Sequence, residues 1–333
     1  MTVNIIDPHL HLFNRSRGDY HWLKTQNPPF WSDKSIIQQD FSIDEINNSL
    51  LVNNKINLSG FIHIEAGFDN TQPWRELEYI ESLDCQSNRT IASIDLLAIP
   101  EYFQASLKRL QLCQSLIGAR HIFDEQAYTI LANQNSQQNF ASLNEVTDFI
   151  FELQLPLADE SAINVMPLLI QTIANNSQLR FIINHAGFPP KASSKDINRD
   201  AWSLWQQHIT EIAKYPNVFI KCSGWEMQDR QYKMSWFSKI TSFCLKTFSV
   251  ERVMLASNFP LCLLGKKLGN KPGSKVETKV SSNIENELSN KDYENYWLDI
   301  LGSEVIKQCN ENEKNALLYH NALRIYQLSN AIR

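Results

Sequence analysis

The stretch IIDPHLHLFN, residues 5–14, is the part of the sequence that says most about the fold. Its centre, Asp7-Pro8-His9-Leu10-His11, places two imidazoles two residues apart at the end of a short β-rich run. Because side chains alternate along a strand, the rings of His9 and His11 leave the same face and can converge on one cation or one substrate oxygen. An H-x-H pair is a weak signal alone, so its meaning depends on the rest of the chain.

The same strand-first pattern recurs along the sequence. Short β-rich runs that end in polar or glycine residues alternate with longer stretches of helical spacing. We place eight such runs near Val3–Asp7, Ser59–Glu65, Ile91–Leu97, Leu116–Arg120, Asp148–Leu155, Leu179–Asn184, Val218–Lys221 and Arg252–Ala256. Eight βα units predict an α/β protein with one closed (β/α)8 (TIM) barrel spanning residues 1–333 as a single domain. A doubly wound open sheet is the rival, but no glycine-rich phosphate loop follows any run.

Three segments depart from this repeat. The connection Phe13–Asp40 after the first strand is long and aromatic, which is typical of a lid. The stretch 265–291 carries six lysines among Gly, Ser and Asn, and predicts a polar insertion after the eighth strand. A solvated loop is the simpler interpretation of this insertion, and substrate binding is the alternative. The tail Glu311–Leu328 has one apolar face and predicts a closing helix packed on the barrel.

The composition favours a folded enzyme with a small-molecule partner. Hydrophobic residues make up 43% of the chain and charged residues 20%, which excludes disorder as the main state. The net charge of −5, without a dense basic stripe, argues against nucleic acid and membrane surfaces as partners. No apolar run approaches the roughly 18 residues that span a bilayer, and no export signal is visible. Six scattered cysteines predict reduced thiols and a cytoplasmic protein, and a homo-oligomer stays possible.

Strand parity predicts which side chains point into the barrel. The predicted inward sets, in strand order, are Ile5, Asp7, His9 and His11; Phe61, His63 and Glu65; Gly118 and Arg120; Ile150, Glu152 and Gln154; Phe181, Ile183 and His185; Phe219, Lys221 and Ser223; Met254, Ala256 and Asn258. On the second strand, Ile62, Ile64 and Ala66 are predicted to face the helices. The polar members gather at the carboxyl ends of the strands, where barrels of this kind build active sites.

Motifs that extend nearly end to end then point to a family. They are IIDPHLHLFN at 5–14, GFIHIEAG at 60–67, GARH at 118–121, FIINHAGFP at 181–189, YPNVFIKCSGW at 215–225, RVMLASNFP at 252–260 and NALRIYQL at 321–328. With these motifs the sequence resembles the amidohydrolase superfamily of TIM-barrel, metal-dependent hydrolases. It is most similar to the lactonase-like branch that includes fuconolactonase, sulfomuconolactone hydrolase and pyrone-dicarboxylate lactonase. The resemblance implies a hydrolytic site at the barrel mouth, acting on a lactone or amide carbonyl.

The resemblance also implies a metal-ligand set, which this chain matches only in part. His9, His11 and His185 match three histidine ligands of the family. The family's fifth-strand histidine is replaced by Gln154, and its metal-binding, proton-accepting aspartate at the end of the eighth strand corresponds to Asn258. An amide takes no proton at neutral pH and is a weak, uncharged ligand. Two possibilities stay open: one divalent ion, zinc foremost, on three histidines, or a metal-free site in which histidines and an arginine polarise the carbonyl.

If water attacks a carbonyl here, a group other than an aspartate must accept its proton. Glu65 and His185 are the candidate bases, because burial and neighbouring charges can tune the pKa of each. Asn258 completes the candidate catalytic set.

Several side chains are candidates for holding the substrate. Arg120, together with Lys221, is predicted to bind a substrate carboxylate or the developing oxyanion. A guanidinium suits this role because it can donate two parallel hydrogen bonds to a carboxylate. The other substrate-binding candidates are His63, Gln154 and His121. For Glu65 and Arg120 the alternative is a buried ion pair that only braces the barrel.

Three functions from different classes remain after this reasoning. The first is a hydrolase that opens a sugar lactone or a carboxylated lactone. The second is a metal-dependent decarboxylase of an unsaturated carboxylic acid. The third is a non-catalytic binding protein descended from a hydrolase, with Gln154 and Asn258 marking the lost catalysis.

Overall fold

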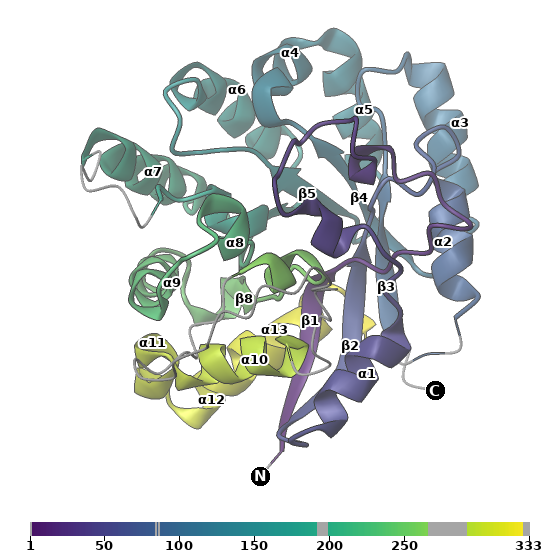
Figure 1. The fold of residues 1–333 in the computed structure, drawn as a ribbon. Coiled ribbons are helices and arrows are strands. Elements are labelled where there is room, and N and C mark those ends of the chain that lie inside the picture. The colour runs from purple at the N-terminus through teal and green to yellow at the C-terminus, as the bar shows by residue number, and fades with distance from the viewer. Residues whose placement is uncertain (1, 84, 86, 192–198, 266–291, 329–333) are drawn as a thin grey trace.

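The computed structural model describes residues 2–83, 85, 87–191, 199–265 and 292–328, and within them the chain folds as a (β/α)8 barrel (Figure 1). Eight strands lie side by side in chain order, every neighbouring pair parallel. The strands are β1 (Val3–Leu10), β2 (Ile56–Ile64), β3 (Asn88–Ser93), β4 (Leu116–Ile122), β5 (Ile150–Gln154), β6 (Arg180–Ile183), β7 (Val218–Cys222) and β8 (Val253–Leu255). All eight predicted strands and the fold class are therefore confirmed.

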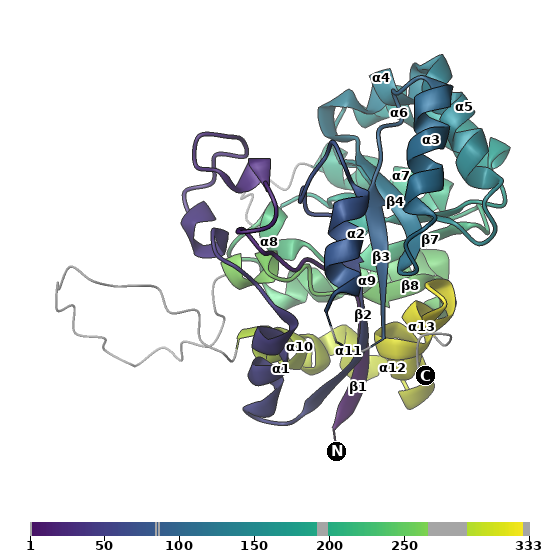
Figure 2. The ribbon, with the colours of Figure 1, turned by 90° about the vertical axis from the view of Figure 1, so that its right-hand side faces the viewer.

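Helices surround the strands on the outside, as both ribbon views show (Figures 1 and 2). They are α1 (Ile43–Leu51), α2 (Trp74–Glu81), α3 (Pro100–Leu110), α4 (Ala127–Ala132), α5 (Gln134–Asn144), α6 (Ala162–Asn175), α7 (Arg199–Ile212), α8 (Trp225–Gln228), α9 (Met234–Phe248), α10 (Asp292–Gly302), α11 (Glu304–Gln308), α12 (Glu311–Asn315) and α13 (Asn321–Ile325). Local sequence fixes several ends: Ser42 and Glu45 form a reciprocal capping box at the start of α1. No helix of the described residues is long and apolar enough to cross a membrane.

The barrel closes where the loop after β8 meets β1. The Asn258 amide donates to the carbonyl of His9 at 2.9 Å, and the His11 amide donates to the carbonyl of Phe259 at 2.7 Å. These two bonds join opposite ends of the chain directly beside the H-x-H pair. The predicted polar insertion that follows, residues 266–291, lies outside the described residues.

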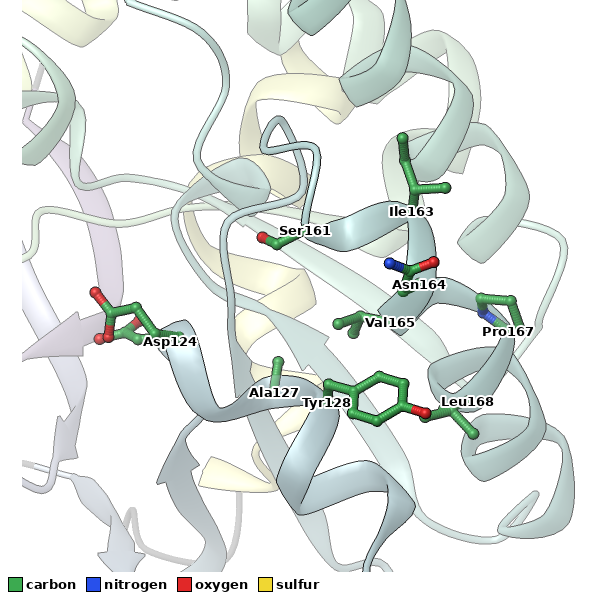
Figure 3. Close-up of a pocket in the computed structure, with 10 residues that line it drawn as sticks. Asp124, Ala127, Tyr128, Ser161, Ile163, Asn164, Val165, Pro167 and Leu168 are labelled. Atoms are coloured by element: carbon green, nitrogen blue, oxygen red, sulfur yellow. The ribbon is translucent and has the colours of Figure 1, made fainter.

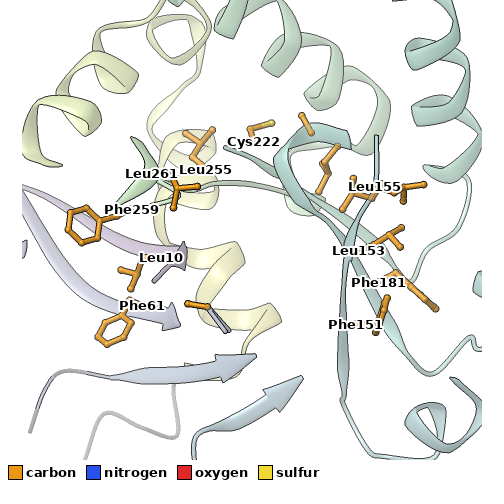
Figure 4. Close-up of a cluster of buried hydrophobic side chains, with 14 of the residues drawn as sticks. Leu10, Phe61, Phe151, Leu153, Leu155, Phe181, Cys222, Leu255, Phe259 and Leu261 are labelled. Carbon is orange, nitrogen blue, oxygen red and sulfur yellow. The ribbon is translucent and has the colours of Figure 1, made fainter. Parts of the chain in front are cut away.

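Two hydrophobic layers separate the inside of the barrel from the helical shell. The inner layer consists of Ile6, Ile62, Ile64, Ile91, Ile117, Ile150, Ile182, Phe219 and Met254 with residues of the C-terminal tail. The outer layer lies between the strands and the helices, and part of it, including Leu10, Phe61, Phe151, Phe181 and Leu255, is drawn in Figure 4. The inner layer fills the barrel below its mouth, so any site is confined to the carboxyl ends of the strands.

This layering corrects the predicted parity on three strands. Ile62 and Ile64 point into the barrel, whereas Phe61 and His63 face the helices. Likewise Ile5 of β1, and Phe181 and Ile183 of β6, belong to the outer layer. On β4, β5, β7 and β8 the predicted inward orientation agrees with the structure for one residue of each strand, in that order Arg120, Ile150, Phe219 and Met254. On β1 and β6 the physical reason is irregular backbone, described below, which breaks the simple alternation; on β2 the apolar residues occupy the inward face and the polar His63 the outward one.

The C-terminal tail plugs the end of the barrel opposite the mouth. The predicted closing helix over Glu311–Leu328 is present as α12, a π-helical turn at Ala316–His320, and α13. Ala322, Ile325, Tyr326 and Leu328 are buried among the inner strand residues. Tyr326 connects this tail to the strands, since its hydroxyl donates to Glu152 Oε1 of β5 at 2.5 Å.

The aromatic connection after β1 is an ordered loop held by a buried lysine. Lys34 Nζ donates to three loop carbonyls, those of Trp22, Lys24 and Asn27, at 2.7–3.1 Å. Asp33 in the same loop pairs with Arg230, which follows α8, at 2.7 Å. The loop is thereby tied to the segment that follows β7.

Candidate functional site

Three of the predicted site histidines come together at the mouth. The ring centroids of His9 and His11 lie 5.1 Å apart, and those of His9 and His185 lie 4.8 Å apart. All three side chains are buried. His9 and His11 point inward although Ile5 and Asp7, which share their parity, do not; the reason is a register shift in the β1–β2 ladder between Asp7 and Leu10.

Backbone strain brings the third histidine into the cluster. On regular parity His185 would follow Ile183 to the outer face, but His185 and Ala186 adopt left-handed conformations, with φ of 53° and 51°. The loop after β7 allows this arrangement only with a glycine, because a Cβ on Gly224 would lie 2.3 Å from His185 Nδ1. His185 Nδ1 is also 3.0 Å from Ser223 Oγ. The strained backbone and the close packing therefore fix the His185 ring on the inner side of β6, toward the barrel axis.

His11 is hydrogen-bonded to the Ile64 backbone and to the Asn258 side chain, whereas His9 and His185 keep ring nitrogens without a protein partner among the described residues. His11 Nδ1 donates to the Ile64 carbonyl at 2.8 Å, which directs Nε2 toward the site. The Ser223 contact occupies Nδ1 of His185 and leaves its Nε2, and both ring nitrogens of His9 are buried without a partner. Unpartnered buried nitrogens are rare in folded proteins and point to a ligand.

The histidines are kept neutral. Burial lowers the pKa of His9, His11 and His185 well below the ordinary value. Two buried cations add to this effect: Lys221 is the next cause for His9 and His185, and Arg120 for His11. A neutral ring keeps a nitrogen lone pair, so these side chains can accept a proton at neutral pH.

Arg120 is held in place by two neighbours and keeps part of its donor capacity. Its Nε donates to Glu65 Oε1 at 2.7 Å, its Nη2 to the Glu65 carbonyl at 2.8 Å and its Nη1 to Gln154 Oε1 at 3.0 Å. The guanidinium has five N–H groups, so two have no partner among the described residues. Glu65 serves here as the ionic partner of Arg120, which fits the bracing alternative, and Gln154 orients the same guanidinium.

Lys221 lies deeper, where it forms an ion pair with a carboxylate and donates to the Pro8 carbonyl at 3.3 Å. Its Nζ is 2.6 Å from Glu152 Oε2 and both side chains are completely buried. Burial lowers the pKa of Lys221 to about 8, against the attraction of Glu152. Tyr326 donates to the other oxygen of Glu152, so the C-terminal plug supports this pair. Lys221 thus acts on the histidines by its charge.

Two of the predicted substrate-binding residues do not join the cluster. His63 faces α2, where its Nε2 lies 2.9 Å from Glu76 Oε1 and its Nδ1 accepts from the Leu12 amide. His121 lies on the face opposite that of its neighbour Arg120, and its Nδ1 accepts from the Leu96 amide. Both positions follow from strand parity, which places an outward residue next to each inward one; the predicted inward orientation of His63 is corrected here, and substrate binding by either residue stays a prediction.

Asn258 lies at the site with a partner that the sequence reasoning did not include. Its Nδ2 donates to Glu226 Oε1 at 2.6 Å, and the other oxygen of Glu226 has no hydrogen-bond partner within the part of the chain that the structure describes. Both side chains are buried, and burial raises the pKa of Glu226 to about 7. The available signal was position: Glu226 follows the end of the seventh predicted strand by a few residues, at the same rim as the other polar groups.

A groove of about 630 Å3 lies beside the site between α4 and α6, lined by Tyr128, Ile163 and Leu168 among others (Figure 3). Asp124 stands at the end of the groove, and its carboxylate is hydrogen-bonded to Gln154, the neighbour of Arg120. None of the predicted site residues lines this groove. Asp124 connects the groove to the surroundings of Arg120, through its hydrogen bond with Gln154 and by its charge.

The donor set does not match a resident divalent cation. Within the described ranges, no group of three or more His, Cys, Asp or Glu side chains has the arrangement of a metal site. Neutral imidazoles are the form that binds zinc, but among the described residues no carboxylate is paired with the three histidines, and Nδ2 of Asn258 is committed to Glu226. Arg120 and Lys221 already place positive charge beside the cluster. A dication here would lack charge compensation.

Comparison with known proteins identifies the family to which the sequence is similar. A family model described as amidohydrolase matches residues 114–328. The L-fucono-1,5-lactonase of Burkholderia multivorans is 23% identical over 282 residues, which cover 78% of this chain and 83% of that enzyme. The matched segment of the family model contains Arg120, His185, Lys221 and Asn258.

Solved structures agree with the fold. An amidohydrolase from Burkholderia multivorans with bound Hepes is similar with a TM-score of 0.72 and 18% identity, covering 98% of this chain and 99% of that one. A crystal form with bound zinc gives 0.70 at the same identity and coverage. A protein assigned as 2-pyrone-4,6-dicarboxylic acid hydrolase from Pseudomonas putida gives 0.61 at 16% identity, again over 98% and 99% of the two chains.

The buried carboxyl of Glu226 predicts a pH-dependent stability. Its pKa of about 7 in the folded protein exceeds the ordinary 4.5, so the folded state binds the proton more tightly and stability falls as the pH rises from about 4.5 to 7. For such a shift the free energy of unfolding falls by on the order of 3 kcal/mol across this window. In Glu226→Gln this fall is absent.

Urea unfolding of wild type and Glu226→Gln at a series of pH values measures the difference. Glu101→Gln, at an exposed carboxylate of α3, is the matched control and follows the wild-type curve. Parallel curves for wild type and Glu226→Gln would show that Glu226 carries no such shift.

Proposed function

The chain belongs to the amidohydrolase family, and from this premise we propose that it opens a lactone by attack of water at the barrel mouth. The observation that carries the proposal is the convergence of buried, neutral histidines beside Arg120, which keeps two free N–H groups. This combination offers a proton acceptor and a cationic hydrogen-bond donor to one carbonyl group.

Two relatives supply the substrate class. The similar L-fucono-1,5-lactonase is named for a sugar lactone, and the 2-pyrone-4,6-dicarboxylic acid hydrolase for a carboxylated cyclic ester. Both substrates contain an ester carbonyl within a ring and polar substituents around it. For this chain we therefore infer a sugar lactone or a carboxylated lactone as substrate.

The first half of the reaction forms a tetrahedral intermediate. The free N–H groups of Arg120 bind the lactone carbonyl oxygen, where negative charge develops. His185 Nε2 takes one proton from water as the water oxygen bonds to the carbonyl carbon and the C=O electron pair moves onto oxygen. The contact of Nδ1 with Ser223 and the strained backbone hold the ring in place for this transfer.

The second half breaks the ring. The oxyanion pair re-forms the carbonyl, the bond from carbon to the ring oxygen breaks, and His185 returns its proton to that oxygen. The product is a hydroxy acid, which ionises at neutral pH and releases one proton to solvent. Atoms and charges balance without a further reactant.

The proposal includes a site that acts without a resident metal. Members of the wider family commonly bind a divalent ion, and one similar structure contains zinc, but the donor set here lacks an anionic ligand. Arg120, with Lys221 behind the histidines, supplies the positive charge that a metal would otherwise bring. No step above depends on a metal.

Assay of a panel of sugar lactones and carboxylated lactones by pH-stat tests the function. Wild type is expected to release one proton per ring opened, and His185→Ala to lose about 10²- to 10⁴-fold in kcat/KM, the usual contribution of a general base. His320→Ala, at an exposed histidine of the tail, is the matched control and keeps wild-type activity. No acid release over a broad panel by folded protein contradicts the proposal and favours a binding protein.

Elemental analysis of protein purified without chelator tests the metal-free site. We expect zinc, iron and manganese well below one equivalent, and lactone hydrolysis unchanged after dialysis against EDTA. One equivalent of metal whose removal abolishes activity would contradict this part of the proposal. Metal-dependent release of carbon dioxide from an unsaturated acid would favour the decarboxylase instead.

A further inference from the structure

Glu226 is a buried acidic side chain that the reaction outlined above does not use. It lies on α8, just beyond the end of β7, with 0% of its surface exposed, and Asn258 is 1% exposed. The 2.6 Å bond from Asn258 Nδ2 to Glu226 Oε1 is the only hydrogen bond of the carboxylate to another side chain among the described residues. A carboxylate this deeply buried with a single such partner is costly, so it needs an explanation.

The bond determines which end of the Asn258 amide meets the site. In the structure Glu226 Oε1 accepts from Asn258 Nδ2, and once Glu226 is ionised, above its pKa of about 7, it can only accept and therefore rejects Oδ1. The backbone of Asn258 is fixed as well, because its amide donates to the His9 carbonyl and its φ is 61°. With Nδ2 turned to Glu226, Oδ1 is left for the histidine side, where the Asn258 side chain is hydrogen-bonded to His11.

Glu226 is itself anchored by its surroundings. Arg230 donates to the Glu226 carbonyl and pairs with Asp33 of the aromatic loop. Besides Arg230, the titratable groups that face the carboxylate are Tyr232 and Tyr296. Tyr296 donates to the Ala256 carbonyl, which ties α10 to the strand end that carries Asn258. The carboxylate therefore has little freedom to turn away from the amide.

We propose that Glu226 is a positioning residue for the proposed lactone opening, and that its carboxylate holds the Asn258 amide with Oδ1 toward the histidine cluster. In that orientation Oδ1 accepts a hydrogen bond from the attacking water and aims a water lone pair at the carbonyl carbon, while His185 takes the other proton. The flipped amide would present a donor to the water and oppose the attack. The expected effect on kcat rests on the proposed function. The orientation of the Asn258 amide can be measured whether or not that function is correct.

A residue swap tests the kinetic consequence. Glu226→Gln keeps the size and shape of the side chain, but the glutamine amide can offer either an acceptor or a donor to Asn258 and no longer fixes its orientation. We therefore expect kcat to fall by about ten- to a hundred-fold with KM nearly unchanged. Asn258→Asp places two carboxylates against each other and lowers kcat too. The double variant Asn258→Asp/Glu226→Gln restores a donor facing an acceptor and is expected to be at least about ten-fold more active than Asn258→Asp.

Side-chain amide NMR makes the test independent of activity. In protein labelled with 15N-asparagine, the Asn258 NH2 signal is identified by its absence in Asn258→Asp. We expect it to move in Glu226→Gln and to stay in place in Glu101→Gln. An unmoved signal overturns the inference whether or not any lactone is hydrolysed. If the wild type is active, an unchanged kcat in Glu226→Gln overturns the inference as well. So does a double variant whose loss of kcat is the product of the two single losses. An inactive wild type whose Asn258 signal does move in Glu226→Gln counts only against the proposed function.

Discussion

The structure depends most on one buried carboxylate, Asp7, at the point where the barrel closes. Asp7 accepts hydrogen bonds from the hydroxyl of Ser257 at 2.5 Å, the amide of Ser257 at 3.1 Å, the hydroxyl of Tyr293 at 2.9 Å and the amide of His9 at 3.2 Å. It therefore joins β1, the end of β8 and α10. Burial still raises the pKa of Asp7 to about 6, so the junction is held at an electrostatic cost. The site lies directly above it, because His9 and Asn258 are the neighbours of these residues.

A second constraint is the charge balance inside the barrel. Two cations, Arg120 and Lys221, lie near the histidines, and each has its own carboxylate, Glu65 and Glu152. Burial is the main reason that the pKa values of the rings are lowered and the rings stay neutral, and the two cations add to this effect. Replacing one partner would leave an uncompensated buried charge, which is strongly destabilising. The plug residue Tyr326 bonds to Glu152, so the fold at one end of the barrel and the electrostatics at the other are connected.

Sequence could predict the strands because each is a short β-rich run with a polar end, and it could predict the family because the motifs recur along the chain. It could not predict which way every side chain points. Alternation fails at the register shift after Asp7 and at the left-handed residue His185, and neither is visible in a pattern of period two. His63 was misplaced for the related reason that the inner face of β2 is apolar and its outer face carries the polar residue.

The partner of Asn258 was missed because it depends on distance in space. Glu226 and Asn258 are 32 positions apart and meet only because β7 and β8 are neighbours in the sheet. A motif describes one rim segment at a time, whereas the contacts of a barrel mouth join segments. The same holds for Arg120 of β4, whose role could be anticipated but whose two anchors come from other strands: Glu65 follows the end of β2, and Gln154 ends β5.

The central claim is that the histidine cluster and the free N–H groups of Arg120 bind the carbonyl of a lactone. A crystal structure of the wild-type protein with the hydroxy acid released from its best lactone substrate tests this claim most directly. The account predicts the product carboxylate within hydrogen-bonding distance of both Arg120 and His185 Nε2, with Asn258 alongside. A product bound in the groove between α4 and α6, with Arg120 contacting only Glu65 and Gln154, would contradict it.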